Sequence, residues 1–166
     1  MKLLRNLAVA AITAVATISP AMARVEAGTG NLLKVLAENG IYVTINEQCD
    51  GRYHGMYRFV GMKREMHLCP GDTVDAIDHS TVRHEATHAI QHCVNVARGT
   101  HINTPILSYE ELRDAVNTYL SEDTVNFIKE AYPQEHWLVE LEANLLEQTA
   151  TADELLELFV EACVGG

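Results

Sequence analysis

The residues most able to do chemistry are His84, Glu85 and His88, in the stretch His84-Glu85-Ala86-Thr87-His88. Two histidines four residues apart lie on one face of an α-helix, about one turn from each other. Their imidazoles can therefore converge on one tetrahedral Zn²⁺. Glu85 points to the side of such a metal, where a water molecule could lose a proton to its carboxylate. The alternative is an amphipathic helix whose histidines merely line a polar face.

The residues on either side of this stretch make the interpretation as a zinc site more specific. Thr81 lies three residues before His84, positions 82, 86, 87 and 89 are uncharged, and Ile90 is apolar. Residues 81–90 resemble the extended signature of the zincin metallopeptidases at every position. The resemblance implies one Zn²⁺ per chain, held by His84 and His88, and a peptide or protein substrate. It also implies that a zinc-bound water attacks the peptide carbonyl, with Glu85 as general base.

A catalytic zinc needs a third protein ligand. The metzincin branch, which continues with a glycine and a third histidine, is excluded because Gln91 and Val94 occupy those positions. His92 lies eight residues, about 12 Å along a helix, from His84, which is too far to share one metal with it. We therefore interpret His92 as a helix-surface residue or as a support for a ligand.

A better candidate for the third ligand lies downstream, in Glu140-Leu141-Glu142-Ala143-Asn144. This segment resembles the Glu-x-x-Ala-Asn motif of gluzincins of the CAAX-protease-like and ImmA-like groups. The resemblance implies that Glu140 is the ligand, with Asn144 one turn later on the same face. Glu142 is the rival; it lies about 200° around the helix, so only one of the two can face the metal. Alternatively, both are solvated charges on an acidic helix, like Glu135, Glu147 and Glu154.

The sequence gives weaker indications of the other parts of such a site, namely an oxyanion donor and a strand that could bind substrate. A hydrogen-bond donor to the developing oxyanion often assists, and Tyr109, Tyr132 and His136 are candidates, each of which could equally be a packing or surface residue. The strand at residues 64–69 resembles the zincin edge strand, which could pair with an extended substrate.

The N-terminus has the features of a secretory signal peptide. Lys2 and Arg5 precede an uncharged, mostly apolar run over residues 7–18, and Ala21-Met22-Ala23 forms a small-residue cleavage site. The run is too short to span a bilayer comfortably. We expect cleavage after Ala23, a secreted or periplasmic location, and a single zincin-like domain over residues 24–166.

The net charge of −11 disfavours nucleic acid and anionic membranes as partners. Four cysteines follow the signal segment, and an even number in an exported chain predicts two disulfides. Of the three pairings we favour Cys49–Cys69 with Cys93–Cys163. Cysteine ligation of zinc is disfavoured, because no Cys-x-x-Cys pair occurs.

Periodicity and turn signals predict an α+β fold with a small antiparallel sheet, an active-site helix and a helical C-terminal half. This order of elements resembles the zincin architecture, so the resemblance implies a zincin-like fold. The sheet is expected within residues 41–69, after a helix over residues 31–38. The active-site helix is expected from near Asp75 to Ala97, followed by a loop over residues 99–107. Further helices are expected after 108, over 134–149 and over 151–163. Ser108 with Glu111, and Thr151 with Glu154, form capping boxes.

Two other classes of protein compete with a peptidase. One is a non-catalytic zinc-binding or partner-binding module on a zincin scaffold, which would hold zinc without turnover. The other is a disulfide-stapled helical protein without a metal. Zinc content and chelator sensitivity distinguish the three.

Overall fold

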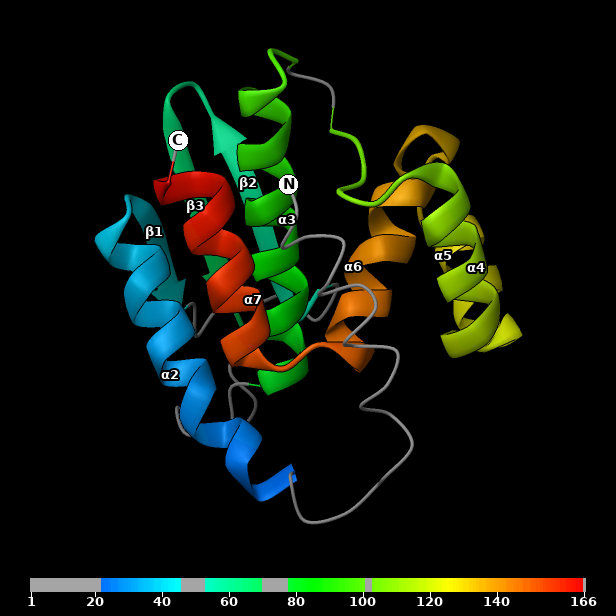
Figure 1. Ribbon diagram of the computed structural model, residues 1–166, viewed down its shortest axis with the longest axis horizontal. Helices are drawn as coiled ribbons and strands as arrows, with labels where there is room; N and C mark the ends of the chain where they lie inside the picture. Colours follow the sequence, from blue (N-terminus) through cyan, green and yellow to red (C-terminus); the bar gives the residue numbers. More distant parts are fainter. Residues whose placement is uncertain (1–21, 46–52, 70–77, 101–102, 166) are drawn as a thin grey trace.

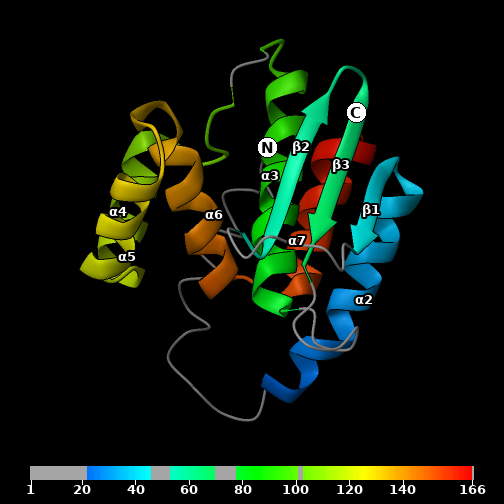
Figure 2. The same cartoon turned by 180° about the vertical axis from the view of Figure 1, so that it is seen from behind.

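A three-stranded sheet lies against one side of the long helix α3 (His79–Ala97), as Figures 1 and 2 show from opposite sides. The computed structural model describes residues 22–45, 53–69, 78–100 and 103–165. Its strands are β1 (Ile41–Ile45), β2 (Gly55–Val60) and β3 (Lys63–Leu68), in the order β1-β3-β2. Together with six α-helices in the described residues, the sheet gives the predicted α+β class.

The sheet is mixed, so the prediction that all its strands are antiparallel is wrong. β2 and β3 form an antiparallel hairpin, with Gly61 at φ +65° in its turn. β1 instead runs parallel to β3, which makes β3 the central strand. Alternating apolar residues predict which face of a strand is buried, but they do not specify the neighbour or its direction.

The inner face of the sheet and three helices form the main core. Met66 and Leu68 of β3 and Ile41 of β1 are buried there, with Ile90 of α3 and Phe159 of α7 (Ala152–Phe159). Burying these side chains fixes α3 against the sheet and so fixes the direction in which its polar residues point.

Helix α2 (Met22–Glu38) is longer than the expected helix over residues 31–38. Gly28 and Gly30 do not end it, although glycine costs about 1 kcal/mol in a helix interior. A Cβ at Gly28 would lie 2.9 Å from the Asp153 side chain and 3.2 Å from that of Ala152, so close packing on α7 favours glycine here. The helix ends at Asn39-Gly40, as expected, with Gly40 at φ +80°.

Helix α3 begins at His79, where the Asp78 carboxylate caps it by accepting the N–H of Ser80. The expected start near Asp75 falls in residues 70–77, outside the described residues. The helix ends at Ala97, as expected, and Gly99 follows at φ +73°. Its run of 19 residues without glycine or proline keeps positions 84, 85 and 88 on a regular helix.

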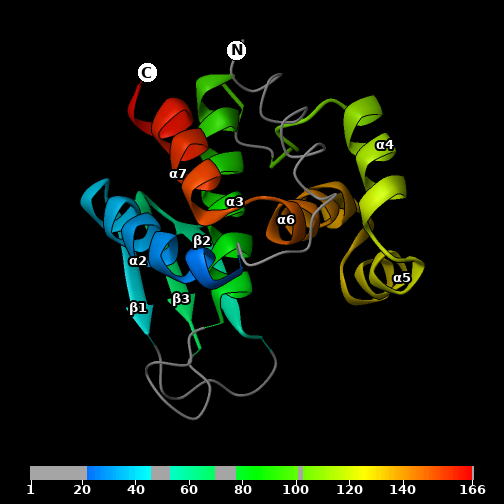
Figure 3. The same ribbon diagram turned by 60° about the horizontal axis from the view of Figure 1, so that its bottom comes forward.

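The C-terminal half is helical. Its elements are α4 (Tyr109–Tyr119), α5 (Glu122–Ala131), a 3₁₀ turn (Gln134–His136), α6 (Trp137–Thr149), α7 and a π-helical turn (Val160–Val164). Both predicted capping boxes are present, at the starts of α4 and α7. Leu112, Ile128 and Leu145 belong to a second core formed by α4, α5 and α6. Figure 3 shows α6 between α3 and the α4–α5 pair.

The predicted disulfide between Cys93 and Cys163 is confirmed, with an S–S distance of 2.08 Å. It joins α3 to the C-terminal turn. Cys69 is also disulfide-bonded, and its predicted partner, Cys49, lies outside the described residues.

Residues 1–21 also lie outside the described residues, so the signal peptide stays a prediction. Among the helices that the structure describes, none has the length and apolar composition needed to cross a membrane.

Candidate metal centre

Three potential metal ligands meet where α6 crosses α3. Nε2 of His84 lies 3.2 Å from Nε2 of His88 and 3.4 Å from Oε2 of Glu140. Nε2 of His88 lies 3.5 Å from Oε1 of Glu140. Glu140 is buried and the two histidines are partly buried. The structure therefore brings together the three residues that the sequence analysis singled out.

These three side chains can hold a metal ion. Four ligands placed tetrahedrally about 2.0–2.1 Å from a zinc ion are about 3.3 Å apart, close to the separations observed here. Oε2 of Glu140 is buried without a hydrogen-bond partner, since the 3.4 Å approach to His84 is not a hydrogen bond. A buried oxygen without a partner, beside two imidazole nitrogens, is the environment that a cation satisfies.

The opposite ring nitrogens of both histidines face acceptors. Nδ1 of His84 lies 3.0 Å from Oε2 of Glu147, and Nδ1 of His88 lies 2.8 Å from Oε1 of Gln91. A proton on each Nδ1 satisfies these acceptors and leaves the Nε2 lone pair facing the cluster. Partners of this kind orient the histidine ligands of metal sites and increase their basicity.

Without a metal, the histidines and carboxylates of the cluster shift one another's pKa values. Burial alone would lower the pKa of His84, but the neighbouring carboxylates of Glu140 and Glu147 outweigh it and raise this pKa to about 10. Burial alone would raise the pKa of Glu140, but the two histidines outweigh it and lower this pKa to about 2. A proton and a metal ion would therefore compete for Nε2 of His84.

Glu85 occupies the space between the cluster and strand β2. Its side chain is buried, and burial raises its pKa, although His88 and His84 oppose the shift. The backbone N–H of Tyr57 donates to its carboxylate. A Cβ at Gly55 would lie 2.8 Å from Cγ of Glu85 and 2.5 Å from Cγ2 of Thr81, so β2 can approach α3 this closely only at a glycine.

Glu140 and Glu142 have different surroundings. The Glu142 side chain is fully buried away from the cluster, where it accepts the N–H groups of Ile106 and Leu107, each at 2.7 Å, and the Gln91 amide at 2.9 Å. It is therefore neither a neighbour of the histidines nor a solvated charge. The amide of Asn144 donates to the backbone carbonyl of Glu140 rather than to its carboxylate.

Of the three suggested oxyanion donors, Tyr132 lies near the cluster. Burial, together with the nearby carboxylates of Glu140 and Glu85, raises the pKa of its hydroxyl to about 12. The hydroxyl thus keeps its proton and can donate. Tyr109 and His136 are exposed.

The structure shows where His92 lies and which strand borders the site. His92 does not join the cluster; its ring packs 4.5 Å from that of Phe59 and 6.1 Å from that of Tyr57, on the sheet side of α3. The expectation of an edge strand at 64–69 is wrong, because β3 pairs on both sides. Within the described sheet, the strand that borders Glu85 and has one neighbour is β2.

Three residues around the cluster, Glu147, Gln91 and Gly55, are not predicted from the sequence. Glu147 is not a solvated charge of an acidic helix: it follows Glu140 by seven residues, which places it on the same face of α6. Gln91 follows His88 by three residues, which also places it on the ligand face. The role of Gly55 has no local signal, because it depends on how closely β2 packs against α3.

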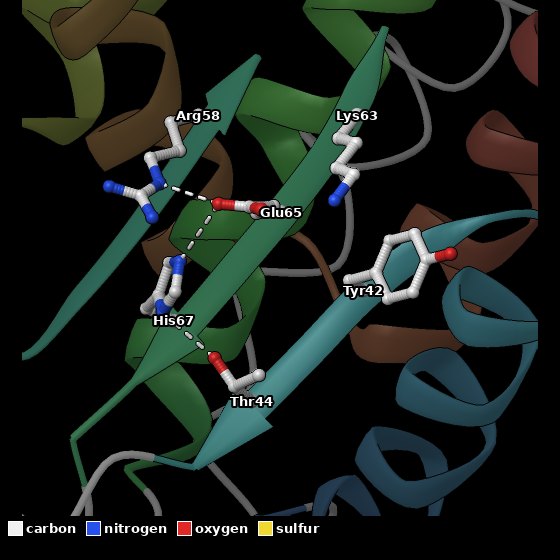
Figure 4. A pocket seen from close by; sticks show the side chains of 6 residues that line it. All are labelled: Tyr42, Thr44, Arg58, Lys63, Glu65 and His67. Carbon is white, nitrogen blue, oxygen red and sulfur yellow. Dashed lines mark hydrogen bonds and ion pairs between the residues drawn. The ribbon is translucent and has the colours of Figure 1, made fainter. Parts of the chain in front are cut away.

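A separate shallow cavity of about 210 Å³ lies on the outer face of the sheet, away from α3 (Figure 4). Its lining residues are Tyr42, Thr44, Arg58, Lys63, Glu65 and His67. The Glu65 carboxylate accepts from Arg58 at 2.7 Å and lies 3.4 Å from His67, whose other nitrogen lies 2.8 Å from Thr44 Oγ1. These polar groups largely satisfy one another, and none belongs to the metal cluster.

Comparison with known proteins does not place the chain in a family. No protein-family model, curated protein or solved structure matches it. The arrangement of the described side chains is therefore the basis for a functional proposal.

Proposed function

We propose that this protein is a zinc-dependent metallopeptidase with a zincin-like site, in which His84, His88 and Glu140 hold one Zn²⁺. The observation that carries the proposal is the convergence of two imidazole nitrogens and one carboxylate group, with closest N···N and N···O distances of 3.2–3.5 Å, from side chains up to 56 positions apart in the sequence. Two imidazoles and one carboxylate are a frequent ligand set of catalytic zinc. When bound there, the metal would supply a Lewis acid that polarises a carbonyl and acidifies water.

Glu85 has the properties of a general base. Its carboxylate directly follows a ligand position on α3, and burial raises its pKa, which makes the carboxylate a stronger base. We infer that it takes a proton from the attacking water and passes it to the leaving amine. The Tyr57 N–H and the close approach of β2 at Gly55 hold it in place.

Tyr132 and β2 supply the remaining parts of the proposal. Tyr132 remains protonated up to high pH and is the donor we assign to the oxyanion that forms from the peptide carbonyl. β2 has one strand neighbour in the described sheet, so its free edge could pair with an extended peptide beside Glu85.

We also propose that the protein is exported. The composition of residues 1–23 supports this location, and so does the Cys93–Cys163 disulfide, because disulfides persist in oxidising compartments.

The test is cleavage of an unfolded protein substrate by the wild type, before and after removal of metal with a chelator. We expect cleavage that the chelator abolishes and Zn²⁺ restores, and that falls by about 10²–10⁴-fold in Glu85→Gln with zinc content unchanged. Glu157→Gln, at an exposed position, is the matched control.

Other results would overturn the proposal in different ways. Full activity in Glu85→Gln would exclude this mechanism. One zinc per chain without cleavage of any substrate would favour the non-catalytic binding module. Absence of zinc, with no loss of stability in chelator, would favour the metal-free helical protein.

A further inference from the structure

Behind His88 lies a chain of buried hydrogen bonds that contains none of the proposed metal ligands beyond His88 itself. Nδ1 of His88 lies 2.8 Å from Oε1 of Gln91, and Nε2 of Gln91 donates to Oε2 of Glu142 at 2.9 Å. The side chains of Gln91 and Glu142 are fully buried. They connect His88 on α3 to the buried side of α6.

The surroundings fix the orientation of the Gln91 amide. Its NH₂ group faces two acceptors, Oε2 of Glu142 and the carbonyl oxygen of Val139, the latter at 3.0 Å. Turning the amide over would place its oxygen against both of them. Oε1 of Gln91 must therefore face His88, and this oxygen can only accept. The proton of a neutral His88 then lies on Nδ1, and Nε2 presents its lone pair to His84 and Glu140.

The chain of hydrogen bonds continues into the segment before α4. Glu142 accepts the N–H groups of Ile106 and Leu107, each at 2.7 Å. Asn95 of α3 donates to the carbonyl of Thr104 at 2.9 Å, and Arg98, which follows the last residue of α3, donates to the carbonyls of Pro105 and Ile106. Residues 104–107 are thus anchored to the same two helices that carry the cluster.

We propose that Gln91 and Glu142 are positioning residues for the metal centre. Glu142, anchored to residues 106–107, holds the Gln91 amide in one orientation, and Gln91 selects the Nδ1–H form of His88. This inference rests on the proposed metal site. It explains why a carboxylate two residues from a ligand is buried without being a ligand.

The first measurement uses the wild type and needs no substitution. Nitrogen-15 NMR of the histidine rings in the zinc-loaded protein identifies which nitrogen of each ring carries the proton. We expect the protons of His84 and His88 on Nδ1. A proton on Nε2 of His88 would overturn the inference.

The second measurement compares the zinc dissociation constants of the wild type, Gln91→Met and Gln148→Met. Gln148 is exposed on α6 and serves as the matched control. Loss of such a partner weakens metal binding by about 10–100-fold, and we expect this for Gln91→Met alone. We also expect the His88 ring signals to shift or broaden, while those of His84, which Glu147 holds, stay in place. Equal dissociation constants for the two variants, or equal disturbance of both rings, would overturn the inference.

Two outcomes separate this inference from the proposed function. If the wild type binds no zinc, the proposed metal site fails, and the NMR spectrum of the metal-free protein still reports the proton position on His88. If Gln91→Met does not fold, Gln91→Glu replaces it, because a protonated glutamate keeps an oxygen towards His88 and a donor towards Glu142. We then expect a zinc dissociation constant within about threefold of wild type, and a loss of about 10-fold or more would overturn the inference.

Discussion

At the scale of single residues, His84 is where a proton and a metal ion compete. Glu140 and Glu147 raise its pKa to about 10 despite its burial. The same Nε2 atom faces Glu140 and His88, so it cannot keep a proton and also bind a metal. The carboxylates of Glu140 and Glu147, which favour the His84 ring as a metal ligand, also increase its affinity for a proton.

This competition predicts proton release on metal binding. At pH 7, below its folded pKa, His84 of the metal-free protein carries the extra proton, whereas Glu140, with a pKa of about 2, carries none. We expect about one proton released per Zn²⁺ bound, and affinity that increases as the pH rises towards 10. Calorimetric titration in buffers of different ionisation enthalpy counts the protons. A binding enthalpy that does not depend on the buffer would contradict the assignment.

Tyr132 provides a test of catalysis that leaves the ligands intact. Its hydroxyl lies near the carboxylates of Glu140 and Glu85, and its pKa of about 12 keeps it protonated. Removal of one oxyanion donor typically lowers kcat by about 10²–10³-fold. We expect such a decrease in Tyr132→Phe with zinc content unchanged, and no decrease in Tyr109→Phe, at an exposed position. A kcat for Tyr132→Phe within about twofold of wild type would exclude this role.

At the scale of secondary-structure elements, the site depends on how closely β2 and α6 pack against α3. β2 brings the Tyr57 N–H to Glu85, and α6 brings Glu140 to the histidines. Both contacts join segments that are distant in the sequence, and both need small or buried residues where the elements meet.

Gly55→Ala tests the approach of β2. The added methyl group would lie 2.5 Å from Cγ2 of Thr81 and 2.8 Å from Cγ of Glu85, so the strand or the glutamate must move. Overpacking of this kind costs about 1–3 kcal/mol in the free energy of unfolding. We expect that loss in urea denaturation, together with reduced kcat/KM and unchanged zinc content. Gly30→Ala, where a Cβ meets no atom within 4 Å, is the control and should not destabilise the fold. Equal stability and activity in the two variants would show that β2 does not position Glu85.

The elements could be predicted from the sequence where the signal is local. The capping boxes at Ser108 and Thr151, the end of α3 and the β2–β3 segments follow from residue types within a few positions. The parallel pairing of β1 with β3 could not be predicted, since alternation gives a face and not a neighbour. The extension of α2 to Met22 depends on the contact of Gly28 with α7, which no local pattern encodes.

The residues of the site also differ in whether a local sequence signal predicts them. The positions of His84, Glu85 and His88 follow from helical spacing alone. The resemblance to the Glu-x-x-Ala-Asn motif indicates Glu140 as the third ligand and leaves Glu142 as its rival, because only one of the two can face the metal. The choice between them depends on the backbone N–H groups of Ile106 and Leu107, which hold Glu142 elsewhere. The residue types around Glu142 do not indicate that backbone N–H groups of a distant loop will bind its carboxylate.

At the scale of the whole molecule, two cores surround one site. The sheet packs with α2, α3 and α7, whereas α4, α5 and α6 enclose the second core. The cluster lies at the contact of α3 with α6, and therefore between the cores. The Cys93–Cys163 disulfide links α3 to the end of the chain and closes a loop that contains α4 to α7.

The disulfide should stabilise the whole fold rather than the site. It joins residues 70 positions apart, and restricting a loop of that length in the unfolded chain contributes about 4 kcal/mol. We expect a loss of this order in the free energy of unfolding of a Cys93→Ala/Cys163→Ala double variant, with zinc content unchanged where the variant is folded. Urea denaturation measures the first quantity and elemental analysis the second. Unchanged stability, or loss of zinc from the folded variant, would contradict this division of roles.

The central claim is that His84, His88 and Glu140 bind one zinc ion, and the zinc content of the purified protein tests it most directly. Elemental analysis should give about one zinc per chain in the wild type and in Glu135→Ala, whose position is exposed, and close to none in Glu140→Ala. A wild-type value below about 0.2 zinc per chain after incubation with Zn²⁺, or full zinc retention in Glu140→Ala, would contradict the claim.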